Sequence, residues 1–341
     1  MRTTIIKPRS SLGRRSMLAS TVAAAALARP AIAQRAHVLR YGSMLPANSI
    51  YHRACVMFGE ELTKLSSGKY KVEVYPDSQL GTIPEMLSAV QTGSLQITMA
   101  VSAWYSKFMK PLDAFTLPYI VPSADQLKAA LNGPLGQRIA GMGESTGFQI
   151  IGFWLIGGRH IVNKVRPVNK PADCAGLKIR VINSQVYIQT FRALGATAVA
   201  MDPSELYLAL QQGVVDGFEY PLPDLISYKF YEVSKYLSLD GHTTDFFLIS
   251  INKALWQGMS KEDQDMMSQA LHTAMAWQWR EQPNEIEASL AKLKTLMQVN
   301  EVSPADKALF VEATRPVYAQ FEASVGKEFL DFARQQLGSA A

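Results

Sequence analysis

The chain has 341 residues, of which 48% are hydrophobic and 18% are charged, and it carries a formal net charge of +5. This length allows two domains of ordinary size, and this composition is typical of a soluble globular protein. The excess positive charge belongs to the first 33 residues, which hold six Lys and Arg and no acid, so the remainder has 34 − 6 = 28 basic and 29 acidic residues. Because the remainder is close to neutral, its charge gives no reason to expect a nucleic-acid partner.

Residues 1–33 have the pattern of an export signal. A basic start is followed by an Ala-rich run at 17–28 and by "AIA" at 31–33, which matches the form of a signal-peptidase site. The order "GRRSMLA", with Arg14 and Arg15 paired, resembles a twin-arginine signal. No later stretch has the roughly 18 consecutive apolar residues of a membrane span. We therefore expect a soluble mature protein in the periplasm, exported by the twin-arginine route.

Cysteine and histidine give no sign of a metal or redox site. An exported protein can pair two cysteines, but Cys55 and Cys174 lie in unrelated predicted contexts and form no C-x-x-C pair, so we expect them to stay unpaired. The five histidines lack the H-E-x-x-H type of spacing, and no G-x-S-x-G, G-x-G-x-x-G or Walker sequence occurs. The usual enzyme signatures are absent, and we expect neither a cofactor nor a metal ion.

The first half of the mature chain alternates strands and helices. Strand-like segments at 38–43, 69–76 and 95–104 are separated by a helical stripe at 49–66 and by a second helix at 84–93, which begins at a proline and ends at a glycine. This β-α-β-α-β rhythm indicates an α/β layer fold.

The second half repeats the rhythm with a different sequence, and no low-complexity linker separates the halves. The chain is therefore expected to cross between two domains several times. The expected elements are two strand-like runs around Gly157 and Gly158 within 149–163, a strand at 176–181, a helix capped by Asn183 or Ser184, a helix from Asp202 to Gly213, a strand at 214–221, an apolar strand at 245–256 and a long helix from Ser260 towards Met297.

Arg180 is the residue that most needs an explanation. In "GLKIRV", at 176–181, the apolar residues share one face of a strand while Lys178 and Arg180 share the other. A guanidinium cannot lose its charge, so near a sheet interior it must meet an anion or reach water. The anion is either an internal acid or a bound carboxylate. A position at the carboxyl end of a strand, beside a helix N-terminus, suits the second alternative.

The segment from Gly176 to Pro221, "GLKIRVINSQVYIQTFRALGATAVAMDPSELYLALQQGVVDGFEYP", carries a specific resemblance. It resembles the DctP-type solute-binding protein of tripartite ATP-independent periplasmic (TRAP) transporters. Similar matches occur at 66–81, 117–121 and 235–242, and the resemblance covers the chain from about Val38 to Phe329.

The resemblance implies an α/β fold with a two-domain periplasmic-binding-protein architecture (type II-like), in which mixed sheets are flanked by helices and a long helix spans both domains. We expect domain I to comprise 34–157 plus 246–285, and domain II to comprise 158–245 plus 286–341. The implied function is a monomeric receptor that closes on a small organic acid and delivers it to the membrane subunits of a TRAP permease.

The resemblance also implies site residues. In this family the arginine of the "GLKIR" strand holds the ligand carboxylate, and that residue here is Arg180. The pattern "GGRHIVN" supplies Arg159, which either contacts the ligand or orders Arg180. Asn183 matches a position that binds substrate oxygens, but it can also act only as a helix cap.

Two aromatic residues make the expected pocket less polar than that of sialic-acid and sugar-acid binders. Tyr220 stands where those relatives carry Asn, and "VSAW" at 101–104 replaces their Glu and Arg, so that Trp104 can stack on a ligand or pack in the core. Ser102 lies in the same stretch. A small apolar or aromatic monocarboxylate is therefore the first expectation for the ligand, followed by a short hydroxy or sugar acid and then by a dicarboxylate that uses both arginines.

Glu219 and His242 have open roles. Glu219 either orients Arg159, contacts a ligand hydroxyl or is structural, and His242 either lies near the cleft or is a satisfied structural histidine.

Two other classes of function compete with transport. An exported enzyme would use Asp216 with Glu219, or Ser102 with a histidine, but a spacing of three places Asp216 and Glu219 on opposite faces of a strand. A ligand-loaded sensor subunit for a signalling receptor would look the same as a transport receptor at this level.

Overall fold

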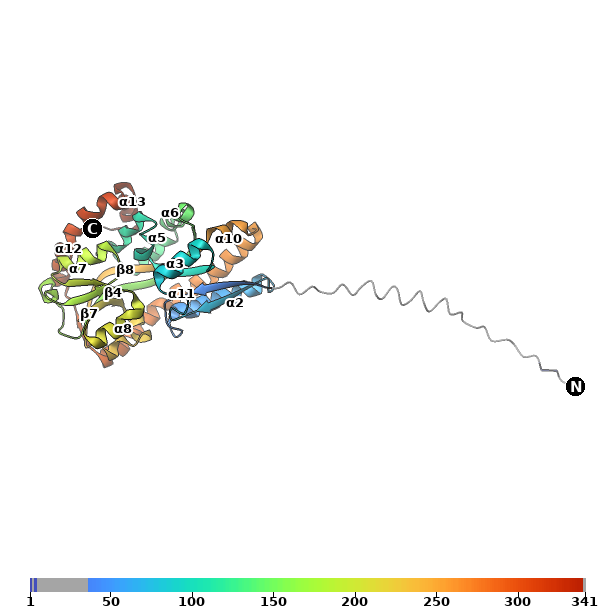
Figure 1. Cartoon of the computed structure of the whole chain (residues 1–341), viewed down its shortest axis with the longest axis horizontal. Helices are drawn as coiled ribbons and strands as arrows, with labels where there is room; N and C mark the ends of the chain where they lie inside the picture. Colours follow the sequence, from blue (N-terminus) through green and yellow to red (C-terminus); the bar gives the residue numbers. More distant parts are fainter. Residues whose placement is uncertain (2, 5–35, 340–341) are drawn as a thin grey trace. The chain divides into compact units, whose positions relative to one another are not determined.

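The computed structural model describes residues 1, 3, 4 and 36–339 (Figure 1). The twin-arginine pair, the Ala-rich run and the predicted cleavage site lie outside the described residues. Within the described part of the chain, no helix has both the length and the apolar character needed to cross a membrane.

The described residues form a nine-stranded mixed sheet with the order β2-β1-β3-β8-β4-β7-β5-β6, and β9 pairs with β8 outside this path. Antiparallel pairing joins β3 to β8, β8 to β4 and β4 to β7, whereas the other pairs are parallel. The strands are β1 (His37–Gly42), β2 (Tyr70–Tyr75), β3 (Ile97–Val101), β4 (Phe148–Asn163), β5 (Lys178–Val181), β6 (Thr197–Ala200), β7 (Gly217–Pro221), β8 (Tyr236–Asn252) and β9 (Gln298–Glu301).

Helices flank this sheet, with α2 and α3 towards one end and α8 beside β7 towards the other (Figure 1). The mixed α/β sheet with flanking helices that the sequence predicts is confirmed. The helices are α2 (Ile50–Leu65), α3 (Ile83–Thr92), α4 (Ser102–Tyr105), α5 (Ala124–Leu131), α6 (Pro134–Met142), α7 (Gln185–Ala193), α8 (Pro203–Gln212), α9 (Leu222–Ser227), α10 (Lys253–Gly258), α11 (Lys261–Leu296), α12 (Pro304–Val325) and α13 (Lys327–Leu337), with 3-10 turns η1 (Lys110–Thr116), η2 (Gly143–Ser145), η3 (Pro171–Cys174) and η4 (Phe230–Glu232).

Several predicted helix ends are confirmed because the expected residues cap them. The Ser49 side chain accepts a hydrogen bond from the backbone N–H of His52 at the start of α2. Asp202 does the same for Ser204 at the start of α8, and Gly213 ends that helix in the left-handed conformation. The helix after β5 begins after Ser184, so of the two predicted caps it is Ser184 that occupies the N-cap position, although its side chain makes no capping hydrogen bond.

β4 and β8 are the long strands of the sheet, with 16 and 17 residues. The sequence predicts two separate runs around Gly157 and Gly158, but the structure has one continuous strand, because the ladder with β8 resumes after each of three register irregularities. The prediction of a strand at 245–256 is wrong at both ends, because β8 begins at Tyr236 and ends at Asn252. Asn252 accepts a hydrogen bond from the N–H of Leu255, and this cap starts α10.

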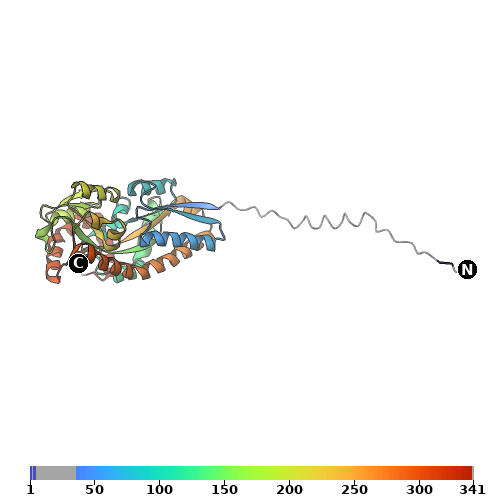
Figure 2. The same ribbon diagram turned by 90° about the horizontal axis from the view of Figure 1, so that it is seen from below.

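The long helix α11 is confirmed, with Ser260 as its N-cap and Pro283 inside it. It packs against α2, β4 and α9, and it runs along one side of the molecule next to α2 (Figure 2). Its Gln278 side chain accepts from the N–H of Leu155 at 3.0 Å and donates to the carbonyl of the same residue at 2.8 Å. These bonds satisfy the backbone of β4 at the irregularity between Leu155 and Gly157.

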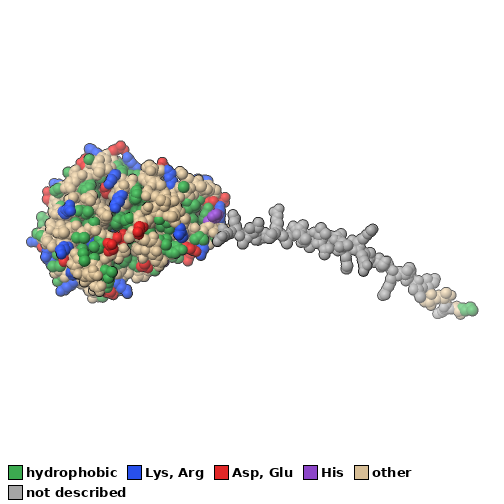
Figure 3. Space-filling view, viewed as in Figure 1, with side chains coloured by type: hydrophobic (Ala, Val, Ile, Leu, Met, Phe, Trp, Pro, Cys, Tyr) green, Lys and Arg blue, Asp and Glu red, His purple; other side chains and the backbone are tan. Residues whose placement is uncertain are grey.

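The described surface carries both signs of charge. Lys and Arg are interspersed with Asp and Glu on the face shown in Figure 3. This distribution agrees with the near balance of acidic and basic residues that follows the first 33.

Gly217, the first residue of β7, allows the close approach of β4. A Cβ atom at this position would lie 2.3 Å from the carbonyl oxygen of Val162 and 2.6 Å from the Cβ of Asn163. We expect Gly217→Ala to lower the free energy of unfolding by about 2–3 kcal/mol, since the backbone would have to move. Gly141→Ala, in α6, has no atom within 4 Å of its new Cβ and should be neutral or stabilising in the same urea titration. Equal stability of the two variants would contradict this explanation.

Candidate functional site

A small cavity of about 10 Å³ brings together side chains that follow the carboxyl ends of several strands. Met44 comes after β1, Trp104 after β3, Ile182 after β5, Pro203 after β6 and Asp224 after β7. This is the edge at which ligands bind in open α/β sheets. The remaining lining residues are Val101, Arg159, Arg180, Tyr220 and Phe247.

Three larger surface depressions, of about 640, 580 and 360 Å³, lie elsewhere and are lined by none of the predicted site residues. The small cavity is the better candidate, because Arg159, Arg180, Tyr220 and Trp104, four of the predicted site residues, converge on it.

Arg180 lies in β5 and is fully buried. Its Nε and Nη2 donate to the backbone carbonyl of Met201, at 3.0 and 2.6 Å, whereas its Nη1 has no hydrogen-bond partner in the described residues. Burial lowers its pKa, yet a guanidinium stays protonated at neutral pH. No carboxylate in residues 36–339 forms an ion pair with it, so the internal acid considered as its anion is not found there.

Arg159, in β4, is paired where Arg180 is not. It forms an ion pair with Glu219 of β7, and its Nη2 donates to Glu219 Oε1 at 3.0 Å and to the Glu219 carbonyl at 3.2 Å. Burial opposes the charge on Arg159, but Glu219 outweighs it and raises the pKa. The ring of Tyr220 lies 5.2 Å from the Arg159 guanidinium and 5.8 Å from that of Arg180. Tyr220 therefore contacts both cations.

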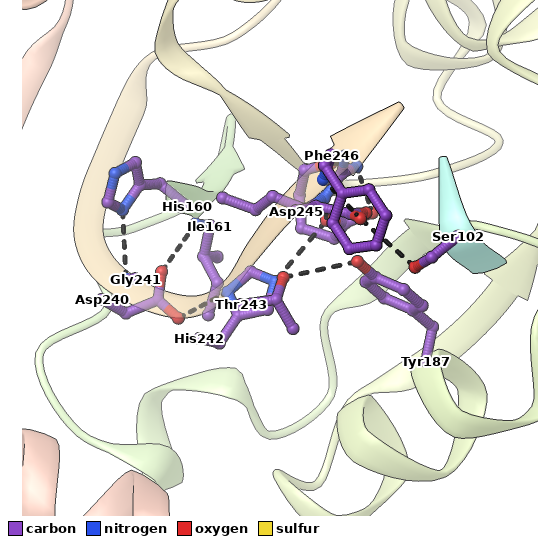
Figure 4. A network of polar contacts seen from close by, with 12 residues as sticks. Ser102, His160, Ile161, Tyr187, Asp240, Gly241, His242, Thr243, Asp245 and Phe246 are labelled. Carbon is purple, nitrogen blue, oxygen red and sulfur yellow. Dashed lines mark hydrogen bonds and ion pairs between the residues drawn. The ribbon is translucent and has the colours of Figure 1, made fainter. Parts of the chain in front are cut away.

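Glu219 also connects to a buried histidine. His242 Nε2 lies 3.5 Å from Glu219 Oε2. Figure 4 shows His242 beside Asp240, and His242 Nδ1 lies 2.7 Å from Asp240 Oδ2. Burial would disfavour a charge on His242, but Asp240 and Glu219 raise its pKa to about 9. Asp240 is itself fixed, since its Oδ1 accepts from the N–H of Ile161 at 2.9 Å. The order Asp240, His242, Glu219, Arg159 thus alternates in charge at neutral pH.

Ser102 and Tyr187 belong to the neighbouring part of this polar network (Figure 4). The Ser102 hydroxyl donates to Asp245 Oδ1 at 3.2 Å. The partner of this hydroxyl is therefore a carboxylate, whereas the nucleophilic serine of the competing enzyme hypothesis would need a histidine. Burial raises the pKa of Asp245 to about 6. Tyr187 lies within hydrogen-bond distance of Thr243, at 3.3 Å.

Five residues named from the sequence do not line the cavity: Ser102, Glu219 and His242, which belong to the polar network, and Asn183 and Asp216. Asn183 is exposed in the loop between β5 and α7. Asp216 precedes β7 and accepts a hydrogen bond from the N–H of Lys178 at 2.9 Å, whereas Glu219 of the same segment is paired with Arg159. Asp216 and Glu219 therefore have separate partners.

Asp224 is the charged lining residue that the sequence did not point to. It lies in the first turn of α9, is 1% exposed, and its Oδ1 has no hydrogen-bond partner among the described residues. Burial raises its pKa to about 7, although the charge of Arg159 opposes this shift. Asp224 lies three residues after the end of β7, just as Trp104 lies three residues after the end of β3. This position after a strand is the sequence signal that could have identified Asp224 as a site residue.

Cys55 and Cys174 are both buried and free. Burial raises the pKa of each thiol to about 12, so neither is a reactive thiolate at neutral pH. In the part of the chain that the structure describes, no group of three or more His, Cys, Asp or Glu is arranged to hold a metal ion.

Comparisons with known proteins agree on one family. The family "Bacterial extracellular solute-binding protein, family 7" (DctP) matches residues 41–324. The sialic acid-binding periplasmic protein SiaP of Vibrio cholerae is 30% identical over 308 residues, which cover 90% of this chain and 95% of that protein.

Solved structures agree as well. The sugar acid binding protein of Advenella mimigardefordensis, in complex with galactonate, has a TM-score of 0.86 at 29% identity and covers 89% of this chain and 98% of its own. A TRAP periplasmic solute binding protein of Sulfurospirillum deleyianum with bound succinate has a TM-score of 0.83 at 28% identity, covering 87% and 97%. The architecture is therefore that of two-domain periplasmic solute-binding proteins.

The charge on His242 makes a testable contribution to stability. The pKa of this histidine rises from an ordinary 6.5 to about 9 on folding, so its stabilising contribution is complete below pH 6.5 and is lost as the pH rises through 9. We expect His242→Gln to be less stable than the parent by on the order of 3 kcal/mol at pH 6, with a gap that closes towards pH 9.5. Urea unfolding across this range measures the gap.

The exposed His272 provides the matched control. His272→Gln should leave the pH profile of the parent unchanged. A gap between His242→Gln and the parent that stays constant with pH would contradict the charged state assigned to His242.

Proposed function

Because this chain belongs to the DctP family of bacterial extracellular solute-binding proteins, we propose that it is a periplasmic receptor that binds a small organic acid through Arg180 and delivers it to a TRAP membrane permease. The family is one of solute-binding transport proteins, which supports binding and release of the acid without chemical conversion. Export by the twin-arginine route remains a prediction from the sequence.

The unpaired cation in the cavity is the observation that carries this proposal. Arg180 is fully buried, and its Nη1 has no partner in the described residues. Its Nε and Nη2 both donate to the carbonyl of Met201. An uncompensated charge in the interior is costly unless an anion meets it. A ligand carboxylate supplies that anion and can accept charge-assisted hydrogen bonds from the guanidinium.

Arg159 is proposed as an orienting residue rather than as the main carboxylate-binding group. Its charge is already balanced by Glu219, and its guanidinium faces the ring of Tyr220. The pair therefore fixes the Tyr220 ring beside Arg180 without competing for the ligand anion.

The cavity walls bear on the ligand class. Apart from Arg159, Arg180 and Asp224, the lining is apolar or aromatic, which supports the predicted apolar or aromatic body for the acid. The similar proteins carry more polar acids, galactonate and succinate. A compact carboxylate with a mainly apolar body is therefore proposed here, with Trp104 and Tyr220 as its aromatic walls.

Binding is proposed to require opening and closing of two domains, comprising residues 34–157 plus 246–285 and residues 158–245 plus 286–341. A cavity of about 10 Å³ is close to the space of a single water molecule and cannot admit an organic acid from solvent. One contact across the proposed domains is the bond from the N–H of Ile83 to Asp202 Oδ2, at 3.4 Å. It joins the start of α3 to the N-cap of α8.

Arg180→Met tests the binding role. The substitution keeps an apolar stem and removes an unpaired buried charge, so the folded protein should be as stable as the parent or more stable. Affinity for the best acid in a thermal-shift screen should fall at least about 100-fold, since a bidentate charge pair contributes roughly 3 kcal/mol or more. Titration calorimetry measures the loss, and the exposed Arg192→Met of α7 is the matched control. Unchanged affinity in Arg180→Met would rule out the proposed contact.

Nitroxide labels on α3 and α8 test closure. Ser88 is exposed on α3 and Leu208 is 56% exposed on α8, and cysteines placed there can be labelled selectively because both native cysteines are buried. We expect a longer and broader distance distribution without the acid than with it, measured by pulsed electron resonance. Labels at Leu208 and the exposed Val165, both in the proposed second domain, should keep one distance. A shift in this control pair instead would contradict rigid-body closure.

A further inference from the structure

Asp224 is a charged group of the cavity to which the proposed function assigns no role. It lines the same cavity as Arg180, is 1% exposed, and has an Oδ1 without a hydrogen-bond partner in the described residues. The cavity therefore holds two unpartnered groups, a donor on Arg180 and an acceptor on Asp224. No ion pair joins them in the described structure.

None of the neighbours of Asp224, which include Arg159, Tyr51, Tyr220 and Tyr228, donates a hydrogen bond to its Oδ1. Arg159, the cation whose charge acts on it, donates to Glu219. The Tyr228 hydroxyl donates to the carbonyl of Met44 at 2.7 Å. Tyr51 accepts from Gln282 at 3.1 Å and is not bonded to the unpartnered oxygen.

A buried carboxyl without a partner is a costly feature of a folded protein. Burial raises the pKa of Asp224 to about 7, which agrees with the geometric finding that no cation pairs with it. Arg180, with its unpartnered Nη1, and Asp224, with its unpartnered Oδ1, line the same cavity. Under the proposed function this cavity opens to a solute. The solute can then supply both an acceptor for Arg180 Nη1 and a donor for Asp224 Oδ1.

We propose that Asp224 accepts a hydrogen bond from a hydroxyl or ammonium group of the bound acid. The ligand is then a carboxylate with a mainly apolar body and one hydrogen-bond donor remote from the carboxylate. This assignment rests on the proposed function, because it requires the carboxylate to lie on Arg180.

The rest of the lining limits the number of donors that the ligand can carry. The residues that remain after the two arginines and Asp224 are Met44, Val101, Trp104, Ile182, Pro203, Tyr220 and Phe247. Apart from the hydroxyl of Tyr220 and the indole N–H of Trp104, their side chains offer no polar atom. A polyhydroxylated acid would bury several hydroxyls without partners, so one donor fits better than many.

Matched acids on two carbon skeletons provide the test. The aliphatic set is pentanoate, 5-hydroxypentanoate, 5-aminopentanoate and glutarate, and the aromatic set is 3-phenylpropanoate and 3-(4-hydroxyphenyl)propanoate. Calorimetry on the parent should show that at least one donor-bearing acid binds at least about 10-fold more tightly than its donor-free match, as expected for a hydrogen bond to a charged group.

Variants at Asp224 distinguish the two kinds of donor. Asp224→Leu should abolish the preference and leave the donor-free acid bound as well as before. Asp224→Asn keeps an acceptor oxygen but removes the charge, so it should retain a hydroxyl ligand within about 3-fold and weaken an ammonium ligand at least about 10-fold. Asp113→Asn, at a buried acid of η1 that does not line the cavity, is the matched control and should leave the preference unchanged.

Each outcome decides a separate point. Equal affinity of donor-bearing and donor-free acids, or tightest binding by glutarate, overturns the role of Asp224 while the proposed function stands. A preference that survives in Asp224→Leu also overturns it. Binding by none of these acids, nor by others in a broad thermal-shift screen, overturns the proposed function together with this inference. If a variant fails to fold, the ligand series on the parent still decides the case.

Discussion

β4 and β8 lie side by side through the middle of the sheet, and the remaining strands attach to them directly or through one or two intervening strands. β3 joins β8 towards one end of the ladder, and β7 joins β4 towards the other. Both long strands therefore run from the part of the sheet that contains β3 to the part that contains β7. A side chain between the two ends of either long strand is close to elements of both parts. Arg159 of β4 and His242 of β8 occupy such places, which is why the polar network forms there.

The distribution of acids around the two arginines leaves one of them paired and the other unpaired. Two guanidinium groups near one tyrosine ring repel each other, and the charge of Arg159 contributes to the lowered pKa of Arg180 after burial itself. Glu219 neutralises Arg159, and Arg159 together with His242 lowers the pKa of Glu219 against the effect of burial. Arg180 is left with a carbonyl as its acceptor, so its positive charge has no counter-ion among the described residues.

Much of this arrangement could be predicted from the sequence. The alternation of strands and capped helices gave the α/β class, and the family resemblance, now confirmed, rested on the segment that contains Arg180 and Tyr220. The pairing of Arg159 with Glu219 was one of the alternatives considered. Strand periodicity can place a side chain on a face, but it cannot place residues from five strand ends around one cavity.

The failures have the same origin. The continuity of β4 depends on the ladder with β8, and the early end of β8 depends on one capping bond of Asn252, so neither follows from hydrophobic pattern alone. Asp224 was missed because an acid in the first turn of a helix normally has a solvent-exposed capping role. Only the tertiary structure shows that this acid is buried among Tyr51, Tyr220 and Tyr228.

The state of the two cysteines has a consequence for how the protein matures. Cys55 and Cys174 are the chain's two cysteines, and both are free and buried. No covalent cross-link has to form before the core can close around them, so folding requires neither an oxidant nor a disulfide isomerase. The same native structure is accessible in a reducing cytoplasm and in an oxidising periplasm, whichever compartment the chain folds in.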